Sequence, residues 1–157
     1  MEWTRIVLVR HGETEWNQEN RWQGSRGTPL SARGRRQCQA AAEALADAGI
    51  GVVYASDLER ARQSAEIIAG RLGLPVRFDV NLRERDVGQW EGLTDEEVSE
   101  RFPEDHVRHL AHPGTFAATG GESREEVFAR VVEFIERLVA DHAGEAVLVV
   151  AHAGPVK

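Results

Sequence analysis

Short apolar runs alternate with longer amphipathic stretches along this chain, and this pattern predicts alternating strands and helices. Residues 6–9 are apolar at every position and mostly β-branched, which is typical of a strand buried on both faces of a sheet. A short strand is also predicted at 52–55, a weaker one at 76–78 and a final buried strand at 146–151. Four strands are therefore expected.

Apolar side chains recur at helical spacing between these strands. Helices are predicted over 31–49, from 56 to 73, in a short stretch that begins near 94 and in a long stretch that begins near 123. Their ends are marked by the capping-box pairs Ser56/Glu59, Thr94/Glu97 and Ser123/Glu126, by Gly49 and Gly73, and by Pro103. The segment between Pro103 and Gly121 carries no clear pattern.

The elements follow one another as strand, helix, strand, helix, strand, helix, helix and strand. Such an order predicts an α/β fold, a three-layer sandwich with a mainly parallel central sheet and helices on both faces. No repeat, low-complexity tract or linker divides the chain, so residues 1–157 are expected to form a single domain. In folds of this kind, ligands bind just beyond the carboxyl ends of the strands.

The composition is that of a soluble globular protein, with 41% hydrophobic and 29% charged residues among 157. No apolar run approaches the roughly 20 residues of a membrane span, and the first residues lack the pattern of a signal peptide. Cys38 is the only cysteine, so no intrachain disulfide can form, and a cytoplasmic location is expected. The net charge of −7 disfavours nucleic acid as a partner.

Side chains that can bind an anion or take part in catalysis follow several of the predicted strands. Arg10 and His11 come directly after the first strand, and His152 directly after the last. Arg60 lies in the first turn of the helix after the second strand, and Glu84 follows the third. Guanidinium groups and a helix N-terminus both favour a tetrahedral anion, so these five side chains are expected to converge on a phosphate.

This set of side chains predicts phosphoryl transfer through a histidine. A neutral His11 would attack phosphorus, and nearby arginine charges are expected to lower its pKa and keep it neutral. Gly12 is expected to leave room for the approaching substrate because it has no side chain. Glu84 would protonate the departing alcohol, while His152 would donate to the equatorial oxygens or act on them as a cation.

The motifs around these residues resemble one known family. Residues 10–17 read RHGETEWN, and the similarity continues through WQG at 22–24, PLS at 29–31, SDLERARQSA at 56–65, LRERDVGQWEGLT at 82–94, GGES at 120–123 and VVAHAG at 149–154. Together they resemble the histidine phosphatase superfamily, also called phosphoglycerate mutase-like. The resemblance covers nearly the whole chain in the same order.

The resemblance implies a role for each matching residue. His11 becomes phosphorylated, and Glu84 is the proton donor. The phosphate pocket is formed by Arg10, Arg60 and His152, and the substrate-binding positions are Asn17, Gln23 and Gly24. Family members usually continue after the second histidine into a further helix, which this chain lacks. We therefore expect either a fragment or a neighbouring subunit that covers the apolar face, as in a homodimer.

The function expected from these residues is a metal-independent phosphomonoesterase that hydrolyses a small phosphorylated metabolite through a phosphohistidine, without a cofactor. The alternatives are a cofactor-dependent phosphoglycerate mutase and a catalytically silent protein that binds a phosphorylated ligand. Residues 83–92, RERDVGQWEG, resemble the phosphatase branches more than the mutases. A metal site at His106, His109 and His112 is a further possibility, which Pro113 and the lack of a nearby acidic cluster disfavour.

Overall fold

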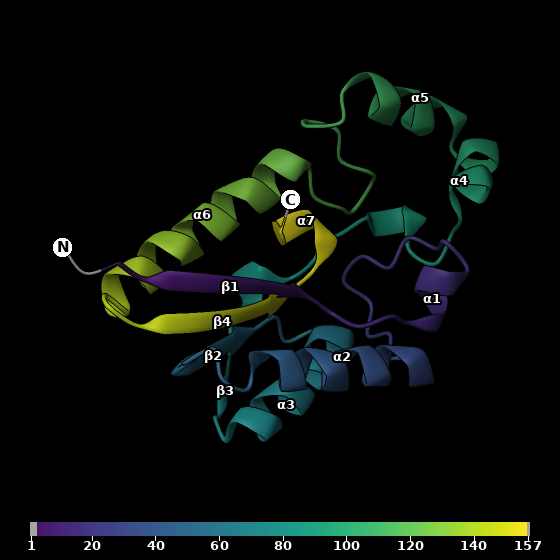
Figure 1. Ribbon diagram of the computed structural model, residues 1–157. Coiled ribbons are helices and arrows are strands. Elements are labelled where there is room, and N and C mark those ends of the chain that lie inside the picture. Colours follow the sequence, from purple (N-terminus) through teal and green to yellow (C-terminus); the bar gives the residue numbers. More distant parts are fainter. Residues whose placement is uncertain (1–2, 157) are drawn as a thin grey trace.

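The computed structural model describes residues 3–156, which contain one parallel sheet with helices on both of its faces (Figure 1). The strands are β1 (Arg5–Arg10), β2 (Val52–Ala55), β3 (Val76–Phe78) and β4 (Ala146–Ala151). The helices are α1 (Glu15–Gln18), α2 (Ala32–Leu45), α3 (Glu59–Leu72), α4 (Asp95–Arg101), α5 (Pro103–Ala111), α6 (Arg124–Asp141) and α7 (Ala153–Val156), with short 3-10 helices η1 (Val80–Leu82) and η2 (Gly88–Trp90).

The four strands lie in the order β1-β4-β2-β3, and every pair is parallel. Val150 of β4 pairs with Val9 on one side and with Ala55 on the other. Because the strands are parallel and in register, the segments after β1, β2 and β4 leave the sheet at the same edge. This edge is where His11, Ser56 and His152 lie.

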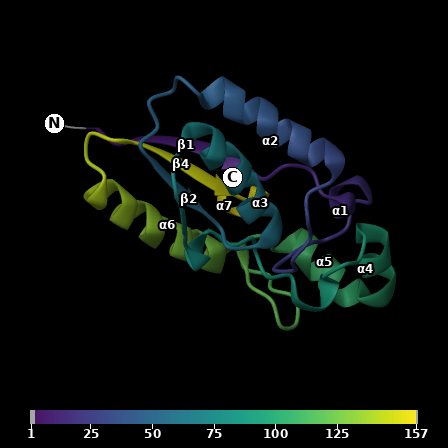
Figure 2. The same cartoon turned by 90° about the horizontal axis from the view of Figure 1, so that it is seen from below.

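The sheet forms the middle of three layers. Helices α2 and α3 cover one face and α6 covers the other (Figures 1 and 2). Leu148 and Val150 pack with Ala42 and Ile68 on the first face, whereas the alternate β4 residues pack toward α6. Side chains of a strand alternate between faces, so β4 contributes to both apolar layers and is the most buried strand. The predicted α/β fold is confirmed.

A smaller apolar cluster lies beneath α4 and α5, beyond the carboxyl ends of the strands (Figure 1). It contains Val87, Trp90, Val98, Phe116 and Ala118, with Trp22 packed against them. Helix α5 occupies the stretch for which the sequence indicated no element. The cluster anchors a cap of helices and loops beside the edge from which the candidate catalytic residues emerge.

Two local predictions are wrong, and each has a clear physical reason. The first strand is not buried on both faces, because β1 is an edge strand and Leu8 is 49% exposed. The predicted capping box of α3 is also absent, since the helix begins after Leu58 and no side chain caps it. The Ser56 hydroxyl binds His152 instead. The capping boxes at Thr94 and Ser123 are confirmed.

No helix between residues 3 and 156 is both long enough and apolar enough to cross a membrane.

Candidate active site

His11 follows β1 directly and is only 7% exposed. Its backbone N–H donates to the carbonyl of Ala151, which continues the pairing of β1 with β4 by one residue. The ring Nδ1 lies 2.7 Å from the carbonyl oxygen of Gly12. A carbonyl can only accept, so this contact assigns the proton to Nδ1 and leaves the lone pair on Nε2, the nitrogen that can attack a substrate.

The pKa of His11 is lowered to about 4. Burial of the ring is the largest cause, and the positive charges of Arg60 and Arg10 lower the pKa further, while the hydrogen bond to Gly12 opposes them. The sequence prediction had the right direction, but it assigned the main effect to the arginines. The imidazole is therefore neutral at every pH well above 4.

The backbone after His11 is held against α2 and α3. The Gly12 N–H donates to the Ser64 hydroxyl at 3.0 Å, and that hydroxyl donates to the Arg60 carbonyl at 2.7 Å. A Cβ on Gly12 would lie 2.5 Å from the carbonyl oxygen of Gly34 in α2. The structure therefore gives a packing reason for glycine at position 12, which is that α2 approaches the segment closely, and the expected role toward the substrate stays a prediction.

Arg60 lies in the first turn of α3, and its side chain is 1% exposed. Its Nη1 donates to the carbonyl of Arg26 and its Nη2 to that of Gly24, both at 2.7 Å. Its Nε is buried and has no hydrogen-bond partner within the described chain. Burial lowers its pKa to about 10, and the charges of Glu84 and Glu91 oppose this shift, so the guanidinium stays positive at neutral pH.

His152 follows β4 and is fully buried beside His11, with 5.2 Å between the ring centroids. Its Nε2 lies 2.8 Å from the Ser56 hydroxyl, whereas its Nδ1 is buried without a partner among residues 3–156. Burial and the charge of Arg60 hold its pKa well below the usual value. A lowered pKa favours the neutral ring, which supports its expected role as a donor over its role as a cation.

Glu84 and Arg10 complete the set at the strand edge. The Glu84 carboxylate accepts from the backbone N–H groups of Arg85 at 2.8 Å and Gly154 at 3.3 Å. A Cβ on Gly154 would lie too close to the same carboxylate, so a larger residue there would displace the end of the Glu84 side chain. Arg10 is exposed, and its charge lowers the pKa values of His11 and His152.

The three residues expected to bind the substrate lie beside this set but are engaged in the protein's own hydrogen bonds. The Asn17 amide oxygen accepts from Thr14 in the capping box of α1. The Gln23 side-chain oxygen accepts from the hydroxyls of Thr14 and Thr28. The Gly24 carbonyl binds Arg60. Sequence reasoning assigned no role to the buried Thr14, although it lies within the motif at 10–17, and the structure shows that it joins Asn17 and Gln23.

The structure therefore places a neutral histidine next to two buried nitrogens without partners, Arg60 Nε and His152 Nδ1. Unsatisfied buried donors are costly unless a ligand binds them, so the arrangement is that of an anion site. The alternative metal site is not formed: His106 pairs with Asp95, and His109 packs among aromatic rings. Over residues 3–156, no three His, Cys, Asp or Glu side chains come together as metal ligands.

Comparison with known proteins shows which family the chain belongs to. The family model described as histidine phosphatase superfamily (branch 1) matches residues 6–157. Phosphoserine phosphatase 1 of Hydrogenobacter thermophilus is 37% identical over 98% of this chain and 72% of its own length. Phosphoglycerate mutase-like protein 4 of Arabidopsis thaliana is 38% identical over all of this chain and 70% of its own.

Solved structures show the same fold. The structure of a mycobacterial glucosyl-3-phosphoglycerate phosphatase in complex with VO3 superposes with a TM-score of 0.89 at 39% identity. The similarity covers 97% of this chain and 76% of that one. Fold, motifs and relatives together define an α/β phosphatase. The chain belongs to the histidine phosphatase superfamily, branch 1.

Proposed function

We propose that the protein hydrolyses a small phosphomonoester through a covalent phosphohistidine at His11, without a metal ion. The observation that carries this proposal is the neutral His11, whose Nε2 keeps its lone pair, beside the buried and unpartnered nitrogens of Arg60 and His152. The names of the relatives, which include phosphatases of phosphorylated metabolites, support this substrate class.

In the proposed first step, His11 Nε2 attacks phosphorus, an N–P bond forms and the bond to the alcohol oxygen breaks. Arg60, Arg10 and His152 stabilise the charge on the equatorial oxygens. A Ser56 hydroxyl that donates to His152 Nε2 leaves the proton on Nδ1, the nitrogen without a partner. His152 is then a neutral donor in the pocket.

Glu84 supplies the proton that the departing alkoxide needs. In the second step a water molecule attacks the phosphohistidine, Glu84 takes up a proton from this water, and inorganic phosphate leaves as the N–P bond breaks. The side-chain oxygen of Asn17 is bound to Thr14, but its amide N–H groups would contact the substrate. Gln23 and Gly24 would shape the entrance to the pocket.

The intermediate itself provides the direct test. Rapid quenching of the enzyme during turnover of a phosphomonoester is expected to trap phosphate on His11 in a form that is labile in acid and stable in alkali. Mass spectrometry of the quenched protein locates the group. A phosphoenzyme that transfers its phosphate to an added alcohol instead of water would indicate the mutase alternative, and a chain that binds phosphate without turnover would indicate a silent binder.

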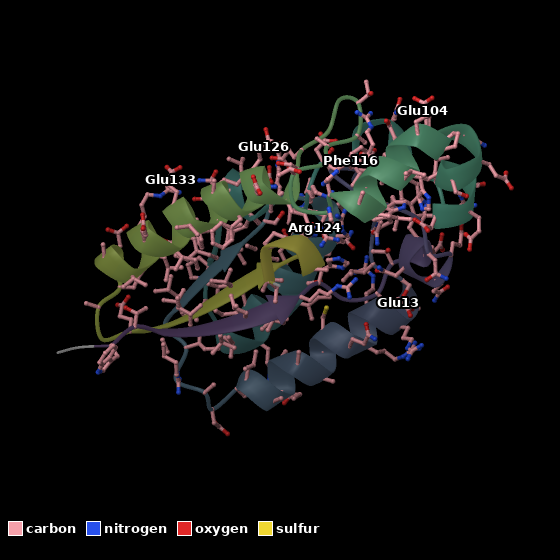
Figure 3. All side chains as sticks on the ribbon, turned by 90° about the horizontal axis from the view of Figure 1, so that it is seen from above. Glu13, Glu104, Phe116, Arg124, Glu126 and Glu133 are labelled. Atoms are coloured by element: carbon pink, nitrogen blue, oxygen red, sulfur yellow. The ribbon has the colours of Figure 1, made fainter. Side chains whose placement is uncertain are left out.

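The role of Glu84 predicts a dependence on the leaving group. Glu84→Gln is expected to lower kcat/KM for an alkyl phosphate by about 10²–10³-fold, because kcat/KM reports the first step, in which the alcohol leaves. The loss for p-nitrophenyl phosphate should be much smaller, because nitrophenolate leaves without a proton. Steady-state kinetics with the two esters measure this difference, and Glu133→Gln, on the exposed side of α6 (Figure 3), is the matched control. Equal losses for both esters would contradict the assignment.

A further inference from the structure

Arg85 follows Glu84 in the chain and is only 7% exposed, yet it forms no ion pair within residues 3–156. Its guanidinium lies over the ring of Trp22, 5.6 Å from the centroid. Burial and the charge of Arg124 lower its pKa, against the opposing charges of Glu84 and Glu122. A buried guanidinium without a carboxylate partner is unfavourable unless a ligand completes the site.

His109 of α5 packs edge-on against the same tryptophan. Its ring is 5.9 Å from Trp22, 5.3 Å from Trp90 and 5.6 Å from Phe116, measured between centroids. The residue is 8% exposed, and its Nδ1 is buried without a hydrogen-bond partner in the described chain. Arg85 and His109 therefore both pack against Trp22, and the Nδ1 of His109 is a polar atom that the described protein leaves without a partner.

Arg124, the first residue of α6, adds a second guanidinium charge to that of Arg85. It is exposed and forms no ion pair in the part of the chain that the structure describes. Its charge lowers the pKa values of both Arg85 and His109. Glu122, whose charge acts on Arg85, is already bound to Arg130 at 3.0 Å.

This cluster of Arg85, His109 and Arg124 borders the proposed phosphate pocket. Glu84, the proposed proton donor, immediately precedes Arg85. Trp22 precedes the segment whose Gly24 carbonyl binds Arg60. The chain carries 26 acidic and 19 basic residues, so carboxylates were available to neutralise the cluster. None of them forms an ion pair with Arg85 or Arg124 within residues 3–156, and His109 Nδ1 has no partner there, as is true of Arg60 Nε and His152 Nδ1 in the proposed phosphate pocket.

We propose that Arg85, His109 and Arg124 form a second anion subsite on the leaving-group side of the phosphate pocket. The substrate would then be the phosphomonoester of an alcohol that itself carries a negative group. The paired guanidinium groups fit a carboxylate, which accepts two parallel N–H bonds. This inference rests on the proposed function, because Glu84 defines the side on which the alcohol leaves.

The test compares esters that differ only in this charge. Phosphate esters of ω-hydroxy carboxylic acids with two to five carbons are each measured against the corresponding primary amide. For at least one chain length, kcat/KM of the wild-type enzyme should favour the acid by about tenfold or more. In Arg124→Gln this preference should fall about tenfold. Arg62→Gln, which removes an exposed and unpaired arginine from α3, should keep it.

Arg85→Gln is a second variant. Because Arg85 is buried, thermal unfolding is used to verify that the protein with this substitution still folds. Equal kcat/KM for acid and amide at every chain length would overturn the subsite, as would a preference that survives in Arg124→Gln. If the proposed phosphatase activity is wrong, neither member of any pair is hydrolysed and no phosphoenzyme forms. That outcome differs from equal hydrolysis of both members, which removes the subsite and leaves the phosphatase.

Discussion

His11→Ala is expected to lower kcat for every phosphomonoester by about 10⁴-fold or more, because it removes the atom that forms the covalent intermediate. The rest of the pocket does not depend on this ring: Arg60 is held by the carbonyls of Gly24 and Arg26, and His152 by Ser56. Binding of inorganic phosphate or vanadate should therefore persist in the variant. Stopped assays of phosphate release together with calorimetric titration measure the two effects.

His11→Asn is the companion variant, since its amide can still donate toward the Gly12 carbonyl while it offers no nucleophile. Replacement of His112, an exposed residue at the end of α5, by alanine is the matched control and should leave kcat within about twofold. Substantial turnover by both His11 variants would refute nucleophilic catalysis at this position. Loss of phosphate binding with loss of turnover would instead indicate that the ring is part of the anion site.

The fold could be predicted wherever one local pattern determined an element. Continuous apolar runs located the strands, and Thr94 and Ser123 marked helix starts because their side chains bind the backbone three residues later. Ser56 carries the same spacing but is not a cap, since His152 lies within reach of its hydroxyl. The position of β1 in the sheet could not be predicted either. Residues 6–9 have the composition of a central strand, yet β1 is an edge strand.

The part of the candidate site that directly follows the strands could also be predicted from a local pattern. His11 and His152 directly follow strands, so the parallel order alone brings them to one edge. The groups that orient these rings, the Gly12 carbonyl and the Ser56 hydroxyl, depend on contacts between distant segments. The cluster of Arg85, His109 and Arg124 comes from three segments, and only the cap of α4 and α5 assembles it. No periodicity or spacing along the chain predicts that these three residues lie close together.

Gly34→Ala is expected to destabilise the protein by about 3 kcal/mol, which corresponds to a fall in Tm of about 6–12 °C. A Cβ at this position would lie too close to the Glu13 carbonyl oxygen and 2.8 Å from the Glu13 nitrogen, and backbone atoms cannot rotate away as a side chain can. Helix α2 would have to move off residues 12–13. Circular dichroism followed during heating measures the change.

Gly70→Ala isolates the cause, because Gly70 also lies within a helix but a Cβ there meets nothing within 4 Å. Alanine is the better helix former, so this variant should gain about 0.5–1 kcal/mol. Gly34→Ala and Gly70→Ala share this gain in helix propensity. The difference between their free energies of unfolding therefore measures the contact of α2 with the segment after His11. If Gly34→Ala proved as stable as Gly70→Ala, the close approach would not be what requires glycine. We expect Gly34→Ala to lower the stability and Gly70→Ala to raise it, and only Gly34→Ala to weaken turnover. These results would link packing at α2 to the position of His11.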